Sequence, residues 1–166
     1  MASYQYASNT TVSVAKTRAE IEEIVMRYGG KSFGSMIEEA AAMILFDMKT
    51  RRIRFTLPLP PKDNKKYSYT PTGKYRSRTP EERYALWEQD CRQKWRALLL
   101  SIKAKLESVS AGISTFEEEF LANIVQHDGH TIGESMMPML DQVVANSTAS
   151  RVLLLPAPQQ SGGLNP

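Results

Sequence analysis

The spacing of apolar residues changes along the chain, and the changes predict its elements. Residues 18–28 have apolar side chains every three or four positions and end at two glycines, a pattern typical of a short amphipathic helix. Residues 32–59 instead form three strand-like stretches, 32–39, 41–48 and 51–59, separated by short turns. In the third stretch apolar residues alternate with Arg and Thr, which predicts one buried face and one exposed face.

Helical spacing returns at residue 80 and predicts the longest element, a helix from Pro80 to about Val109. Its apolar stripe includes Tyr84, Trp87 and Trp95, which we expect to be core residues packed on the sheet. Shorter helices are predicted at 116–125 and from Ile132 to about Ala145, with Pro138 delaying or kinking the last one.

Capping signals support these four helix starts. A Thr followed three residues later by Glu can form a reciprocal capping box, in which each side chain bonds to the backbone N–H of the other residue. The pattern occurs at Thr17–Glu20, Thr79–Glu82, Thr115–Glu118 and Thr131–Glu134.

The predicted fold class is α+β: an N-terminal helix, a three-stranded antiparallel meander, a long amphipathic helix packed on the sheet and two shorter C-terminal helices. With 166 residues, the chain is long enough for one such domain, which we place at 17–146. Residues 1–16 are predicted to be an arm, 147–166 a flexible tail, and 60–78, rich in turn formers, a long basic loop or arm.

Composition points to a cytoplasmic protein. Cys91 is the single cysteine, so no intrachain disulfide is expected, which is typical of a reducing compartment. The longest apolar stretches are far shorter than the roughly 20 residues of a membrane span, and the polar first residues lack signal-peptide features. We therefore expect no membrane partner.

Positive charge is concentrated in one part of the sequence. The formal net charge is only +3, but residues 49–78 contain ten Lys or Arg and the single acid Asp63. Guanidinium groups bind phosphate oxygens in a forked geometry, and bases of a single strand stack on exposed aromatic rings. The predicted nucleic-acid-binding residues are Arg51, Arg52, Arg54, Lys62, Lys65, Lys66, Tyr67, Tyr69, Lys74, Tyr75, Arg76 and Arg78.

The structural alternative is that such a run of cations is a solvated face or protects a strand edge. Three further cations of the long helix lie off its apolar stripe and either extend the basic surface or are ordinary exposed residues: Arg92, Arg96 and Lys103.

Catalytic chemistry is not indicated. The segment 126–134 brings two His, an Asp and a Glu together, but Asp128-Gly129 is a common turn, Thr131 and Glu134 are explained as a cap, and the HEXXH spacing is absent. Cys91 lies on the apolar stripe, where a thiol is inert. We expect no metal, no cofactor and no enzymatic activity.

Several segments resemble a family of small proteins encoded by tailed bacteriophages and prophages. They include "RAEIEEIVMRYG", "RIRFTLPLP", "TPTGK", "DGHTIGE" and, most specifically, the tryptophan-containing helix "WEQDCRQKWRALLLSIKAKLESVSAGISTFEEEFLANIV". The resemblance spans about residues 9–142. It implies a phage origin and expression inside a bacterium, and it transfers no catalytic residue.

These observations predict a non-catalytic phage protein that binds nucleic acid, single-stranded DNA by preference, with a role in recombination or annealing. The outline is similar to the core of single-strand annealing proteins, which assemble into rings, so we expect a homo-oligomer. The alternatives are a phage inhibitor that binds and blocks a host protein, such as a defence protein, and a protein that sequesters an anionic nucleotide signal. A strand-binding surface needs a continuous track of cations, whereas a nucleotide pocket needs only a few that converge.

Overall fold

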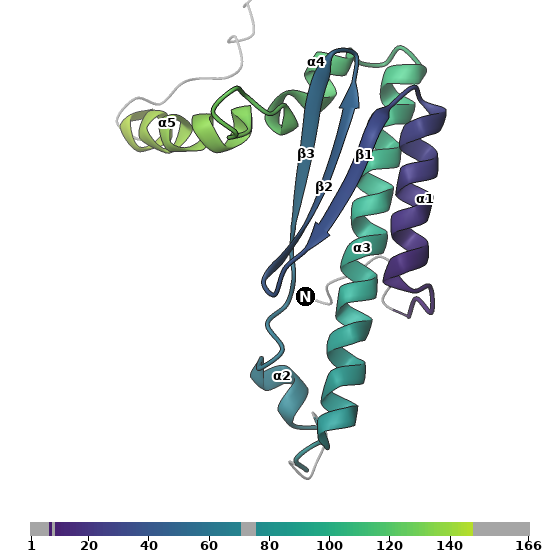
Figure 1. Cartoon of the computed structure of the whole chain (residues 1–166). Coiled ribbons are helices and arrows are strands. Elements are labelled where there is room, and N and C mark those ends of the chain that lie inside the picture. The colour runs from purple at the N-terminus through teal and green to yellow at the C-terminus, as the bar shows by residue number, and fades with distance from the viewer. Residues whose placement is uncertain (1–6, 8, 71–75, 148–166) are drawn as a thin grey trace, which may run out of the picture.

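The computed structural model describes residues 7, 9–70 and 76–147, and the predicted tail from residue 148 onward lies outside them. Three strands form an antiparallel sheet in the order β1-β2-β3: β1 (Lys31–Ile37), β2 (Ala41–Met48) and β3 (Arg51–Pro58). Two helices, α1 (Val14–Arg27) and α3 (Pro80–Ser110), cover one face of this sheet (Figure 1). The predicted α+β fold and meander are confirmed.

The core lies between the sheet and these two helices. Alternate residues of β2 and β3 point toward the helices, so Ile44, Phe46 and Ile53 are fully buried while their neighbours are not. Trp95 of α3 is 1% exposed and belongs to the same cluster. The alternation seen in the sequence therefore marks the buried face of the sheet correctly.

The N-terminal boundary differs from the prediction. Ser13 caps α1, and its hydroxyl accepts a hydrogen bond from the backbone N–H of Lys16. Thr17 was expected to be the cap, but it lies inside the helix, fully buried, and its hydroxyl donates to the carbonyl of Ser13. The predicted arm at 1–16 therefore includes the first turn of α1. The capping boxes of Thr79, Thr115 and Thr131 are confirmed.

Helix α3 extends well beyond the sheet. Its 31 residues span about 46 Å at 1.5 Å per residue, whereas the eight residues of β3 span about 26 Å. Next to its first turns lies a short helix, α2 (Lys65–Ser68), followed by a β-bridge between Tyr69 and Ser77. The described parts of the segment predicted as a long loop or arm, 60–70 and 76–78, thus include a short helix that packs on α3.

The predicted helix at 116–125 ends early. It consists of α4 (Phe116–Phe120) and a 3-10 turn, η1 (Leu121–Asn123), after which Ile124 pairs with Ile53 as a short strand beside β3. Backbone groups otherwise left unpaired at the sheet edge favour this pairing, and the N–H of Val125 donates to the carbonyl of Arg52 at 2.8 Å.

The last helix, α5 (Ile132–Ser147), includes Pro138 and projects away from the rest of the domain (Figure 1). No helix within the described ranges has the length and apolar character to cross a membrane.

Candidate nucleic-acid interface

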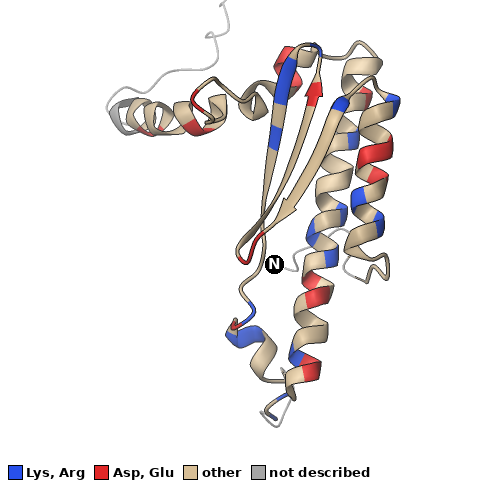
Figure 2. Ribbon diagram, in the orientation of Figure 1, with Lys and Arg blue, Asp and Glu red and all other residues tan. Residues whose placement is uncertain are grey.

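The basic residues of 49–78 do not form one surface. The cations of β3 lie near α4, whereas those around α2 lie at the opposite end of α3 (Figure 2). The two groups are separated by most of the length of β3, because the strand is extended and continues away from the sheet toward α2. A cluster that is continuous in sequence is therefore divided in space.

In the first group, Arg52 is bound to its cross-strand neighbour Asp47. The Nε and Nη2 atoms of Arg52 donate to the two carboxylate oxygens of Asp47 at 2.9 and 3.3 Å. These hydrogen bonds hold the pKa of the Asp47 carboxyl below its usual value. The Arg52 side chain stays 56% exposed, so it can contact a ligand, but part of its charge is already neutralised.

Arg54 binds within the protein. Its Nη1 donates to the carbonyl of Gly129 at 2.7 Å and its Nη2 to Oε2 of Glu134 at 2.5 Å, and its side chain is 16% exposed. The prediction that Arg54 lies open on the strand face as a phosphate contact is wrong. The Arg54 guanidinium thus binds the turn before α5 and the first turn of that helix, a segment far from β3 in sequence.

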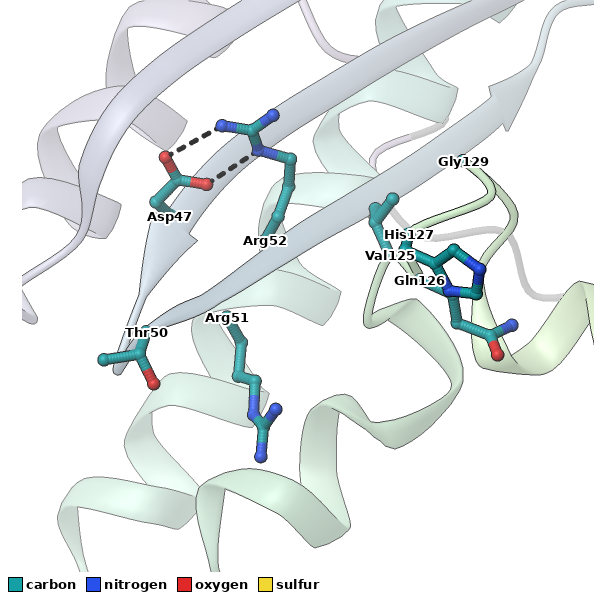
Figure 3. Close-up of a pocket in the computed structure, with 8 residues that line it drawn as sticks. All are labelled: Asp47, Thr50, Arg51, Arg52, Val125, Gln126, His127 and Gly129. Atoms are coloured by element: carbon teal, nitrogen blue, oxygen red, sulfur yellow. Dashed lines mark hydrogen bonds and ion pairs between the residues drawn. The ribbon is translucent and has the colours of Figure 1, made fainter.

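Arg51 lies at the rim of a hollow of about 660 Å³ between the β2–β3 turn and the turn after Val125. Its side chain extends away from the Asp47–Arg52 pair (Figure 3) and has no ion pair or hydrogen bond to any described residue. We call this cavity the hairpin hollow; its lining includes Thr50, Arg51, Arg52, Gln126, His127 and Gly129. Sequence reasoning missed His127 as a neighbour of the arginines, because only the pairing of residues 124–125 with β3 brings it there.

In the second group, Tyr67 is a core residue of the α2–α3 contact. It is 2% exposed, and its hydroxyl donates to Oδ2 of Asp90 at 2.5 Å. Burial and this hydrogen bond raise the pKa of Tyr67 above its usual value. Lys66 forms an ion pair with the same carboxylate. The prediction that the Tyr67 ring holds a base is wrong, because no base can reach it.

Two arginines of this group organise the segment around α2. Arg76 pairs with Glu82 at 2.6 Å, and Nη1 of Arg78 donates to the carbonyls of Lys66, Tyr67 and Tyr69. Both were predicted as phosphate contacts. The three carbonyl contacts make Arg78 a structural residue, while Arg76 keeps a 65% exposed side chain. Lys74 and Tyr75 lie outside the described residues.

Exposed aromatic rings do occur at this end, and one of them, Tyr84, lies on α3. Tyr84 is 56% exposed, and its ring centroid lies 5.4 Å from that of Trp87. Trp87 is partly buried, and its indole N–H donates to the carbonyl of Pro60 at 2.7 Å. The expectation that Tyr84 belongs to the core is wrong, and the same expectation for Trp95 is confirmed. The exposure of Trp87 is intermediate.

Cations surround these rings. The Nζ of Lys62 lies 4.8 Å from the centroid of Trp87, and a hollow of about 190 Å³ opens beside them. This second cavity, the aromatic hollow, is lined by Lys62, Pro80, Arg83, Tyr84 and Trp87. Exposed Lys65 and the 52% exposed ring of Tyr69 belong to the same end of the molecule.

The remaining helix cations are mostly paired. Arg92 binds Glu88 of the same helix at 2.9 Å, and Arg96 binds Glu20 of α1 at 2.5 Å, so neither adds an unpaired cation to a basic surface. Lys103 is exposed on the part of α3 that lies beside the sheet, away from the aromatic hollow.

The polar residues of the segment 126–134 serve local structural roles. Asp128 accepts a hydrogen bond from the backbone N–H of His130 as a turn residue, and Glu134 caps α5. Within the described ranges, no three His, Cys, Asp or Glu side chains gather to hold a metal ion. Burial raises the pKa of the Cys91 thiol to about 11, so the thiolate is scarce at neutral pH.

Comparison with family models, with curated protein sequences and with solved structures finds no match to this chain. The two hollows are thus interpreted from their own chemistry. The aromatic hollow combines flat rings with cations, and the hairpin hollow combines two arginines with an imidazole.

Proposed function

We propose that this protein binds single-stranded nucleic acid without catalysing a reaction, and that the aromatic hollow is its contact surface. The observation that supports this most is the exposed Tyr84 ring beside Trp87, flanked by Lys62 and Arg83. An exposed aromatic pair with cations around it suits an unstacked base and its phosphates.

Single strands are preferred over duplexes on energetic grounds. A base stacked on an aromatic side chain contributes roughly 1 to 3 kcal/mol, and only an unpaired base exposes its ring face. Lys65 and Tyr69 extend the surface beyond the hollow. A duplex would contact the cations and leave Tyr69 and Tyr84 unused.

The wider role, strand annealing or recombination by a homo-oligomer, follows the similarity in outline to single-strand annealing proteins. Its setting inside an infected bacterium follows the resemblance to phage proteins. Annealing requires a protein that holds backbones and leaves base edges accessible, and stacking on ring faces meets that requirement.

Fluorescence anisotropy of a labelled oligonucleotide, titrated with salt, tests the proposal. Tyr84→Ala and Tyr69→Ala should weaken binding at every salt concentration without changing the salt slope, since stacking releases no counterions. Lys62→Ala and Arg83→Ala should each make the slope shallower by about 0.7, the value for one phosphate of a single strand.

Lys103→Ala is the matched control, because it removes an exposed cation from the same helix far from the hollow. Its slope should equal that of the wild type. If the wild type fails to bind at low salt, where attraction is largest, the nucleic-acid proposal is wrong and inhibition of a host protein becomes the leading alternative.

A second candidate, capture of a small anionic nucleotide, is favoured by the hairpin hollow. Arg51, Arg52 and His127 line it from two segments, with Arg51 extending away from the Arg52–Asp47 pair (Figure 3), and a single guanidinium can already bind a phosphate group in a forked geometry. Calorimetric titration with a nucleoside diphosphate should then give binding that is lost in Arg51→Ala and retained in Tyr84→Ala. The opposite pattern would assign nucleotide binding to the aromatic hollow.

A further inference from the structure

Helix α5 presents apolar side chains to solvent along most of its length. Six of them are between 44% and 63% exposed: Met136, Met137, Met139, Leu140, Val143 and Val144. Exposed apolar groups of this size normally occur singly on a soluble protein, and a contiguous set marks an interaction surface. Figure 1 shows the helix projecting away from the sheet and from α1 and α3.

The base of α5 is fixed, so its direction is set by the fold. Glu134 is held by Arg54, and the side-chain amide of Gln126 donates to the hydroxyl of Ser135 at 2.7 Å. Gly133 lies against η1, since a Cβ there would be 2.8 Å from the carbonyl oxygen of Ala122. These contacts direct the helix away from its own sheet.

The outer face of the sheet has an apolar patch on β1 and β2, beside the polar residues Asp47, Arg52, Arg54 and Thr56. Met36, Met43 and Leu45 lie on the face opposite to α1 and α3, because they alternate with the buried positions and pair across the strands. Met36 is 50% exposed and the other two are half-buried. Antiparallel sheets with one solvated face normally place polar side chains there, so the apolar patch on β1 and β2 is a candidate contact surface.

We propose that α5 of one copy packs on the outer sheet face of a second copy, and that the second copy returns the same contact. The proposal rests on the homo-oligomeric state proposed above and is independent of nucleic-acid binding. One chain supplies both complementary surfaces, each rich in methionine, whose flexible side chains adapt to an irregular partner. Because the exchange is reciprocal, it closes as a two-fold dimer and leaves neither surface open.

Area favours this arrangement over pairing of two α5 helices. A stable interface typically buries roughly 1,200 to 2,000 Å² in total. A pair of α5 helices would bury one helix face per copy and leave both sheet faces in water. Reciprocal docking buries the helix face and the sheet patch of each copy, and therefore more surface.

Sedimentation equilibrium of the full chain tests the proposal with two opposite charges. Leu140→Lys changes the helix face, and Met43→Glu changes the sheet face. Each variant by itself should fall to half the dimer mass, because both contacts of its homodimer would bury an unpaired charge. An equimolar mixture should return to the dimer mass. In the mixed dimer one contact holds both substitutions, with opposite charges, while the second contact stays wild type.

The controls are matched by exposure. Leu100→Lys alters a 45% exposed leucine of α3, against 49% for Leu140, and Met26→Glu alters a 41% exposed methionine of α1. Both should remain dimers. Thermal melting confirms that each variant folds, and Met36→Glu replaces Met43→Glu if the latter does not.

Three outcomes would overturn the proposal. If the wild type is monomeric, the proposed dimer does not form. If Leu140→Lys dissociates the dimer and Met43→Glu does not, α5 contacts another α5 or a different surface, and not the outer sheet face. Failure of the mixture to restore the dimer mass excludes the exchange. Fluorescence anisotropy on the same variants tests nucleic-acid binding separately from dimer formation. A dimer that does not bind the oligonucleotide would contradict the proposed function and leave the dimer proposal intact.

Discussion

Arg54 and Glu134, 80 residues apart in sequence, form an ion pair between Nη2 and Oε2 at 2.5 Å. The pair joins the outer face of β3 to the first turn of α5. It explains why an arginine on the exposed side of a strand is 16% exposed, and it makes the position of α5 depend on the sheet.

We predict that Arg54→Met loosens the segment 124–135 before the rest of the domain. Removing hydrogen bonds to a charged group costs roughly 1.5 to 3 kcal/mol, and the carbonyl of Gly129 loses its donor as well. Amide hydrogen exchange should become faster in this segment while the buried strand β2 keeps its protection. Uniform acceleration over both would show that the pair supports the whole fold.

The Glu134 carboxylate should make the stability of the protein depend on pH. The backbone N–H of Thr131, above all, and the charge of Arg54 hold the pKa of Glu134 below its ordinary value of 4.5. Stabilisation by a group with a lowered pKa is complete above the unfolded-state value and is lost as pH falls through the folded-state value. The melting temperature should therefore fall below about pH 4.5, and Glu134→Gln should reduce that fall. An unchanged profile in Glu134→Gln would contradict the role of this group.

Much of the fold follows from local signals in the sequence. The alternation in 51–59 identifies the buried face of β3, and the boxes at Thr79 and Thr115 mark their helix starts, because both depend only on neighbouring residues. The box at Thr17 fails because tertiary packing places that threonine in the core, and Ser13, four residues earlier, is free to cap.

The candidate site was harder to predict, because the partners of its cations are distant in sequence. Asp90 and Glu134 neutralise Lys66 and Arg54, and no count of charges within 49–78 contains them. The exposure of Tyr84, however, could have been predicted from the lengths of the elements. A helix of 31 residues is longer than strands of eight, so its first turns must project beyond the sheet.

Tyr67→Phe should lower the stability of the protein without changing its affinity for an oligonucleotide. Loss of the hydroxyl leaves Asp90 without its neutral donor, which costs about 1 to 2 kcal/mol in unfolding free energy, while the buried ring keeps its packing. Denaturant unfolding should show this loss, and oligonucleotide affinity should equal that of the wild type. A large drop in affinity with unchanged stability would mean that the hydroxyl contacts the ligand.

Substitutions in the turn between β2 and β3 should increase the stability of the protein. Lys49 and Thr50 both have positive φ, 46° and 63°, a conformation that costs an L-residue roughly 1 to 2 kcal/mol and that Asn-Gly adopts readily. Replacing the pair by Asn-Gly should raise the melting temperature by several degrees. Thr50→Val, which keeps the branched side chain, should give no such gain, and a gain there would point to a cause other than the backbone.

The two tryptophans of α3 should respond differently to truncation, because they lie on parts of the helix with different surroundings. Trp95 is 1% exposed within the core, so Trp95→Ala should cost on the order of 3 to 5 kcal/mol. Trp87 lies beside the aromatic hollow and is only partly buried, so Trp87→Ala should cost less and should also weaken oligonucleotide binding. Chemical denaturation and anisotropy on the two variants measure both effects. Equal destabilisation by the two substitutions, with no effect of Trp87→Ala on affinity, would place Trp87 in the core and remove the aromatic hollow as a binding surface.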